Sequence, residues 1–241
     1  MIRRIFPVFL LAISGCALLP GGGDVAGYPE VDLGATAVEV YKSTDQRDLH
    51  LHIFAPLEAA GDPPGAVVLF HGGGFRTTRV EQFQVQAQRL AEAGIVGVVA
   101  EYRVTAEGTT PADAIFDGAD AVRALQSESE RFGVDPDRIA IGGSSAGGAL
   151  AVEAGAEADA VVLFNPAVGV DDAVLVAQPA IAFHSREDTI VPFDRVEDFC
   201  TQAVQCTLVA FDEGDHGFFN NEPALTETTE AMIEFLQSHG W

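Results

Sequence analysis

Hydrophobic and polar positions along the chain follow two periods, which predict strands and helices in regular succession. Two early segments alternate with period two, as half-buried strands do, at 36–42 and 48–56. The later predicted strands include continuous apolar runs bounded by glycine or proline, as in buried parallel strands. They lie at 66–75, 95–103, 137–143, 158–166, 179–185 and 206–212. Helical spacing predicts helices at 80–94, 111–133, 145–155, 193–204 and 224–240.

This succession predicts an α/β fold class. A pair of strands followed by repeated strand–helix units favours a mostly parallel central sheet with helices on both faces. The interval 165–178 between two predicted strands is too short for a lid domain, so we expect no sizeable lid. In such sheets functional residues gather at the carboxyl ends of the strands.

The N-terminal segment has the pattern of an export signal. Arg3 and Arg4 precede a short apolar run, and small residues follow up to Cys16. The segment 13–16 resembles a bacterial lipobox, which implies a signal peptide at 1–15 and a lipidated Cys16. Ordinary signal cleavage nearby is the alternative. Residues 16–35 are rich in glycine and proline and predict a tether, so the folded domain is expected at 36–241.

Composition narrows the possible partners. The chain has 241 residues and a formal net charge of −23. Such a charge repels nucleic acid and anionic membrane surfaces. We therefore expect no nucleic-acid partner, and membrane contact only through an N-terminal lipid anchor in the cell envelope. The sequence predicts neither a metal site nor a cofactor, and it leaves the oligomeric state open.

A pair of serines lies between two glycine pairs in the segment 141–150. The pattern G-x-S-x-G fits only when Ser145 is central, because centring on Ser144 loses one glycine. That pattern marks a sharp strand-to-helix turn that presents a nucleophile. We therefore predict Ser145 as the nucleophile, although a glycine-rich turn without chemistry has the same composition.

A second glycine-rich segment follows the predicted strand at 66–75. Backbone amides in such a loop can bind an oxyanion, since glycines allow close approach. Two of the amides of Gly72, Gly73 and Gly74, with Gly73 and Gly74 favoured, are expected to act together with the amide of Ala146. A phosphate-binding loop is the weaker alternative because the lysine of that motif is missing. His71 is expected to order the loop.

A general base and its orienting acid should follow the nucleophile in the chain. His216 lies in a loop after a strand and is flanked by glycines, whereas His184 is expected to pack and His239 to be solvated. Asp188 lies in the loop after the preceding strand and is the predicted acid. Its rivals are Asp194, which has the position of a helix N-cap, and Asp215; Glu187 is expected to face solvent.

The remaining two cysteines form a candidate disulfide. Cys200 lies near a predicted helix end and Cys206 opens the next predicted strand, so the chain can reverse between them. An exported chain meets oxidising conditions that favour the bond. Two buried free thiols are the alternative.

Together these motifs resemble the α/β-hydrolase superfamily, from about Thr36 to the end of the chain. The resemblance rests on HGGGF, EYR, DPDRIAIGGSSAGG, REDTIVP and DHGFF in that order. The nearest groups are hormone-sensitive-lipase-like carboxylesterases and small acetyl- and feruloyl-esterase-like enzymes. Ser144 replaces the Asp of lipase-like members, and their N-terminal cap segment has no counterpart, so the resemblance favours the smaller group.

The resemblance implies a serine carboxylesterase that works through an acyl-enzyme with Ser145, His216 and Asp188 as its triad. An open, lidless cleft predicts short acyl groups, acetyl above all, on a small ester or an acetylated carbohydrate. An exopeptidase of the same fold and a non-catalytic binding module on this scaffold are the alternatives. The first usually needs further domains, and the second usually lacks a triad residue.

Overall fold

The computed structural model describes residues 31–57 and 61–241. The predicted signal peptide at 1–15, Cys16 and most of the tether predicted at 16–35 lie outside the described residues. The end of that predicted tether packs on the domain, because Leu33 is buried and its carbonyl accepts a hydrogen bond from Gln84 Nε2 (3.0 Å). The packed domain therefore begins before Thr36.

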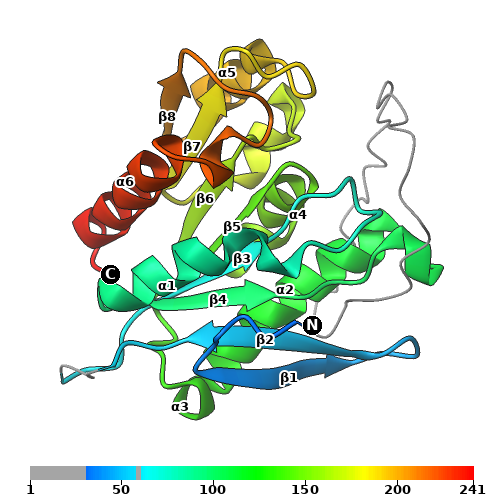
Figure 1. Ribbon diagram of the computed structural model, residues 1–241, viewed down its shortest axis with the longest axis vertical. Coiled ribbons are helices and arrows are strands. Elements are labelled where there is room, and N and C mark those ends of the chain that lie inside the picture. The colour runs from blue at the N-terminus through cyan, green and yellow to red at the C-terminus, as the bar shows by residue number, and fades with distance from the viewer. Residues whose placement is uncertain (1–30, 58–60) are drawn as a thin grey trace, which may run out of the picture.

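Eight strands form one sheet in the described part of the chain, in the order β1-β2-β4-β3-β5-β6-β7-β8 (Figure 1). β2 pairs antiparallel with β1 and with β4, and all other neighbours are parallel. The strands are β1 (Ala37–Ser43), β2 (Asp48–Phe54), β3 (Ala66–Phe70), β4 (Val96–Ala100), β5 (Ile139–Ser144), β6 (Ala160–Phe164), β7 (Ala180–Ser185) and β8 (Cys206–Phe211). The predicted mostly parallel sheet is confirmed.

Helices cover both faces of this sheet, as the sequence predicted (Figure 1). The α-helices are α1 (Gln84–Glu92), α2 (Pro111–Ser127), α3 (Ser129–Phe132), α4 (Ala146–Ala154), α5 (Phe193–Gln202) and α6 (Ala224–Ser238). Short 3₁₀ turns are η1 (Val80–Phe83), η2 (Thr105–Glu107), η3 (Gly155–Glu157), η4 (Val170–Leu175) and η5 (Phe218–Asn220). Residues of α2, α4 and α5 belong to one core cluster, and residues of η1, α1 and α6 belong to the other.

The buried strands divide their side chains between these two cores. In β3 all five residues are buried; Val68 and Phe70 belong to the core with α2, α4 and α5, whereas Val67 and Leu69 belong to the other. Alternate side chains of a strand point to opposite faces. A strand covered on both faces must therefore be apolar at every position, which explains the continuous runs in the sequence.

The predicted helix at 111–133 is interrupted. α2 begins at Pro111 after Thr110, whose side chain and backbone exchange hydrogen bonds with Asp113 in a capping box. It ends before Glu128, and α3 then continues as a separate turn that closes at the left-handed Gly133. The predicted helix at 80–94 likewise begins as the 3₁₀ turn η1 before α1. Helical spacing alone does not reveal such breaks.

The segment between β6 and β7 contains only the turn η4 and its flanking loops. No lid domain is inserted there in the described residues, as the sequence predicted. The parallel strands β3, β5, β6, β7 and β8 end at one edge of the sheet. The loops that follow them carry the residues predicted for the site.

Candidate active site

Ser145 occupies a strained turn between β5 and α4. Its backbone has φ 50° and ψ −116°, a conformation that costs free energy for a residue with a side chain. The flanking glycines explain the turn. A Cβ on Gly147 would lie 2.2 Å from the carbonyl oxygen of Phe70, and one on Gly143 would lie 2.4 Å from that of Gly147. Only glycine permits this approach, so the G-x-S-x-G frame centred on Ser145 has a steric cause.

Neighbouring loops hold the strained turn in place. The Ser145 N–H donates to the carbonyls of Phe164 and Asn165, each at 3.1 Å. The Ser145 carbonyl accepts from the N–H of Ala167 at 2.9 Å. The end of β6 and the loop after it therefore hold both the N–H and the carbonyl of Ser145.

Asp188 and His216, the predicted acid and base, are hydrogen-bonded to each other. His216 Nδ1 donates to Asp188 Oδ2 at 2.6 Å, while Asp188 Oδ1 accepts from the amides of Ile190 (2.8 Å) and Val191 (3.0 Å). Burial opposes ionisation of Asp188, but the bonds from His216 and the amides outweigh it and lower the pKa of this carboxyl. The acid is therefore ionised at neutral pH and fixes the imidazole.

The other nitrogen of His216 has no fixed partner. Its Nε2 is buried and has no hydrogen-bond partner among the described residues. Since the carboxylate of Asp188 accepts the Nδ1 proton, Nε2 carries the free lone pair in the neutral ring. A buried basic nitrogen of this kind is suited to accept a proton from a nucleophile or substrate.

His184 packs beside the acid, as the sequence predicted. Its side chain is fully buried, and Nε2 lies 2.9 Å from the carbonyl oxygen of Val191 and 3.5 Å from Asp188 Oδ2. Burial lowers the pKa of His184 more than the neighbouring Asp188 raises it. The ring is therefore neutral at neutral pH, and its hydrogen bond goes to the Val191 carbonyl. His239 is exposed at the end of α6, also as predicted.

The carboxylate that His216 contacts in the described residues belongs to Asp188 and not to a rival acid. Asp215 is exposed and its Oδ1 accepts from the Gly217 amide at 2.8 Å. Glu187 is exposed, and its carboxylate accepts from the Gly214 amide at 3.3 Å. The N-cap position predicted for Asp194 is wrong: Pro192 is the cap residue, and Asp194 lies inside the first turn of α5.

The loop after β3 contacts the nucleophile. A Cβ on Gly72 would lie 3.3 Å from Cβ of Ser145, so the loop backbone passes directly beside it. The amide of Gly72 is engaged, because it donates to Gln82 Oε1 at 2.7 Å, and this excludes Gly72 as an oxyanion donor. Among the described residues, the amides of Gly73, Gly74 and Ala146 donate to no loop or cap acceptor. These three amides form the candidate oxyanion hole.

His71 orders this loop through buried contacts, as predicted. The side chain is completely buried and stacks on Tyr102, with ring centroids 4.4 Å apart. Tyr102 Oη donates to the His71 carbonyl at 3.0 Å, and His71 Nδ1 bonds to the Gly72 carbonyl. Burial lowers the pKa of His71 from 6.5 to about 4. A neutral imidazole therefore supports the loop through its bond to the Gly72 carbonyl and its stacking on Tyr102.

Two site residues were missed in the sequence. Gln82 in η1 accepts both from the Gly72 amide and from Ser144 Oγ (2.8 Å). It therefore joins the glycine loop after β3, here called the oxyanion loop, to the strand-to-helix turn at Ser145, here called the elbow. Asn165, after β6, donates through Nδ2 to the His216 carbonyl at 2.6 Å. The replacement of the usual Asp by Ser144 was the one signal that a neutral partner such as Gln82 lay opposite.

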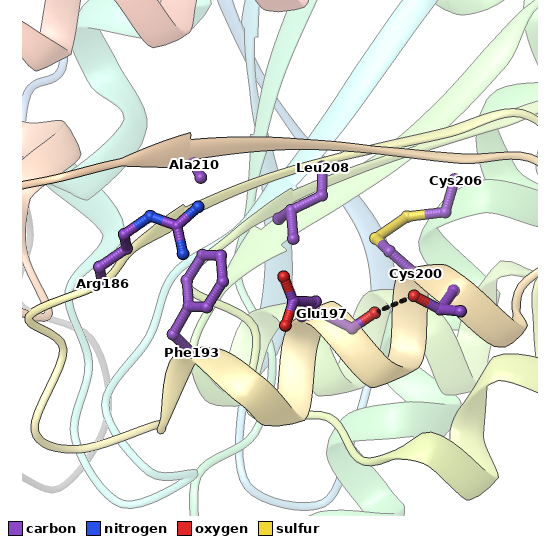
Figure 2. A pocket seen from close by; sticks show the side chains of 8 residues that line it. Arg186, Phe193, Glu197, Cys200, Cys206, Leu208 and Ala210 are labelled. Carbon is purple, nitrogen blue, oxygen red and sulfur yellow. Dashed lines mark hydrogen bonds between the residues drawn. A yellow bond between two sulfur atoms is a disulfide. The ribbon is translucent and has the colours of Figure 1, made fainter.

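A disulfide joins Cys200 on α5 to Cys206 on β8, as predicted. Figure 2 shows it at one end of a groove of about 450 Å³ between this helix and strand. The groove is lined by Arg186, Phe193, Glu197, Cys200, Thr201, Cys206, Leu208 and Ala210. Ser145 and His216, the predicted catalytic residues, are not part of this lining.

Within residues 31–57 and 61–241, no three His, Cys, Asp or Glu side chains converge on a metal position. The same residues include no helix with the length and hydropathy of a membrane span.

The chain is similar to known hydrolases. It shares 31% identity over 109 residues with an ethyl acetate hydrolase of Pseudomonas putida, covering 44% of this chain and 34% of the relative. Two solved structures of a Thermogutta terrifontis esterase, one phosphoramylated by tabun and one bound to butyrate, each share 29% identity and align with a TM-score of 0.80. The alignments cover 87% of this chain and 97% and 96% of those chains.

The chain spans about a third or less of the length of the curated relatives it matches. A family described as the alpha/beta hydrolase fold matches residues 67–205, which include Ser145 and Asp188. His216 lies beyond that range and is assigned by its bond to Asp188. Because the matched residues make up more than half of the chain and the sheet has the same fold, the chain belongs to the alpha/beta hydrolase fold family.

Proposed function

We propose that the chain is a serine carboxylesterase that hydrolyses short-chain acyl esters through an acyl-enzyme. One observation carries the proposal. His216 is fixed on Asp188 through Nδ1 and leaves a buried, unpartnered Nε2, while the adjoining loop clamps Ser145 in a strained elbow. A nucleophile, an oriented base and free backbone donors are the parts required for acyl transfer.

The proposed reaction assigns a step to each of these groups. Ser145 Oγ attacks the ester carbonyl while His216 Nε2 accepts its proton, and the ionised Asp188 stabilises the resulting imidazolium. The amides of Gly73, Gly74 and Ala146 bind the negative oxygen. His216 then protonates the leaving alcohol, and an acyl group remains on Ser145. Water, deprotonated by His216, attacks this acyl group; the bond to Ser145 Oγ then breaks, His216 returns the proton to Oγ, and the acid is released.

The small size of the segment between β6 and β7 supports a short acyl group. With only η4 in that interval, the described residues provide no lid to bury a long acyl chain. Each buried CH₂ contributes about 0.8 kcal/mol to binding, so a lidless site gains little from chain length. The relatives point the same way: one is an ethyl acetate hydrolase, and one structure is bound to butyrate.

We propose acetyl as the preferred acyl group. A site without a lid would also accept a bulky alcohol, which makes acetylated carbohydrate a candidate substrate. Lipidation of Cys16 and a cell-envelope location belong to the same proposal, because an exported, tethered domain would meet extracellular esters. The lipidation and the location rest on the sequence pattern at 1–35.

The test is a series of p-nitrophenyl esters from acetyl to octanoyl, run beside acetylated xylan, with Ser145→Ala as the control for uncatalysed hydrolysis. The proposal predicts the highest kcat/KM with acetyl and a steady decline with length. An optimum at octanoyl would contradict the short-chain assignment. Absence of ester hydrolysis in every case would contradict the esterase assignment.

A further inference from the structure

Asn165 is bonded to all three segments that carry the triad. Its backbone N–H donates to the Phe183 carbonyl in β7, the strand that leads to Asp188, at 2.9 Å. Its carbonyl accepts from the Ser145 N–H at 3.1 Å. Its side-chain Nδ2 donates to the His216 carbonyl at 2.6 Å. One residue therefore links the nucleophile, the strand before the acid, and the base.

The conformation of Asn165 restricts which residue can occupy the position. Its φ of 42° lies in the left-handed region, where glycine and asparagine are the most readily accepted residues. Glycine would satisfy the backbone but would offer no donor to His216. Asparagine meets both requirements, which indicates that the position needs the side-chain donor as well as the left-handed backbone.

The polar environment of the side chain supports the same conclusion. Asn165 is fully buried, and its Oδ1 has no hydrogen-bond partner among the described residues. Burial of an unpaired amide oxygen is unfavourable, so a residue that only filled space there would be apolar. The acceptor at His216 fixes the orientation of the amide, because only the NH₂ group can donate to a carbonyl.

We propose that Asn165 is a positioning residue that fixes the backbone of His216 relative to Ser145. Asp188 holds the imidazole ring at Nδ1, and Asn165 holds the main chain of the same residue. With both the ring and the main chain of His216 held, the position of Nε2 relative to the Ser145 turn is restricted. Misplacement of a catalytic group by a fraction of an ångström to one ångström lowers the reaction rate strongly. The inference rests on the proposed esterase function.

Asn165→Gly is the main test, because it keeps the left-handed backbone and removes the tether together with the rest of the buried side chain. We expect kcat per titrated active site to fall about 10- to 100-fold while KM changes little, and the melting temperature to fall because a cavity is left. Asn165→Asp keeps the shape but turns a carboxylate oxygen toward the His216 carbonyl, and it should lose at least as much. The matched control is Asn220→Asp, whose exposed side chain donates to the Gly217 carbonyl of the same loop at 3.0 Å; it should retain wild-type kcat.

A second measurement does not depend on turnover. The low-field proton resonance of His216 Nδ1, shared with Asp188, should shift or broaden in Asn165→Gly and remain unchanged in Asn220→Asp. Wild-type kcat together with an unchanged resonance in Asn165→Gly would overturn the inference. A lower rate explained entirely by fewer titratable sites would also overturn it, because that reflects folding alone. If the wild-type protein hydrolyses no ester, the proposed function fails, and the resonance still decides the role of Asn165.

Discussion

Gln82 is expected to support both the stability of the oxyanion loop and turnover. Its Oε1 accepts from the Gly72 amide at 2.7 Å and from Ser144 Oγ at 2.8 Å, and both donor residues are buried. Gln82→Ala leaves two buried donors without their acceptor. A buried donor left unpaired costs about 1–3 kcal/mol. The Ser144 hydroxyl can rotate toward another acceptor, whereas the Gly72 amide cannot, so one donor stays unpaired and we expect a loss of about 1–3 kcal/mol in unfolding free energy.

The same substitution frees the loop that carries the amides of Gly73 and Gly74. Removal of one oxyanion donor lowers kcat by about 10²–10³, and a loosened loop that still samples its position should lose less, about tenfold. Urea unfolding measures the first effect, and kcat per titrated site measures the second. Gln82→Glu separates them: its carboxylate accepts both bonds and restores stability, but its negative charge opposes an oxyanion, so kcat stays low.

Gln84→Ala is the matched control in the neighbouring segment. The side chain of Gln84 donates to the Leu33 carbonyl at 3.0 Å, outside the glycine loop. It should cost a small amount of stability and leave kcat unchanged. If Gln82→Ala matches the wild type in both unfolding free energy and turnover, the proposed link between the oxyanion loop and the elbow is wrong.

Three further predictions concern the acid, the disulfide and a buried histidine. Asp188→Asn should lower kcat by about 10⁴, since an amide favours the wrong imidazole tautomer, and steady-state kinetics with activity near wild type would reject this acid. Reduction of the Cys200–Cys206 bond should cost about 2 kcal/mol of unfolding free energy in the chain-entropy model; a serine double variant should not respond to reductant, and free thiols in a non-reducing peptide map would contradict the bond. The pKa of His71, lowered to about 4, means that the unfolded state binds a proton first as pH falls from 6.5. Unfolding free energy should therefore decline by about 3 kcal/mol between those pH values from this group, with a flatter dependence in His71→Asn; equal slopes in urea unfolding would refute it.

The sequence predicted those features whose causes are local. The elbow glycines, the continuously apolar strands and the strand-end positions of Asp188 and His216 follow from short patterns. The fold confirms the steric need for the glycines and the burial of the strands. It also confirms the strand-end positions of Asp188 and His216, because a parallel sheet brings the ends of its strands to one edge. The amide of Gly72 shows the limit of this reasoning, since its engagement depends on a side chain ten residues away.

The supporting residues escaped prediction because their roles depend on tertiary contacts. Gln82 lies 62 positions before Ser144, and Asn165 lies 51 positions before His216, so no spacing rule connects either pair. The packing of Leu33 and the break at Glu128 also depend on neighbours rather than on local propensity. Patterns identify the reacting groups, whereas the contacts that orient them emerge only from the folded chain.

Covalent trapping at the elbow tests the central claim most directly. A fluorophosphonate probe followed by peptide mass spectrometry should place one adduct on Ser145, and Ser145→Ala should neither label nor hydrolyse esters. Ser144→Ala should still label, because its hydroxyl serves Gln82 and not the substrate. An adduct on Ser144, or ester hydrolysis near the wild-type rate by Ser145→Ala, would contradict the account.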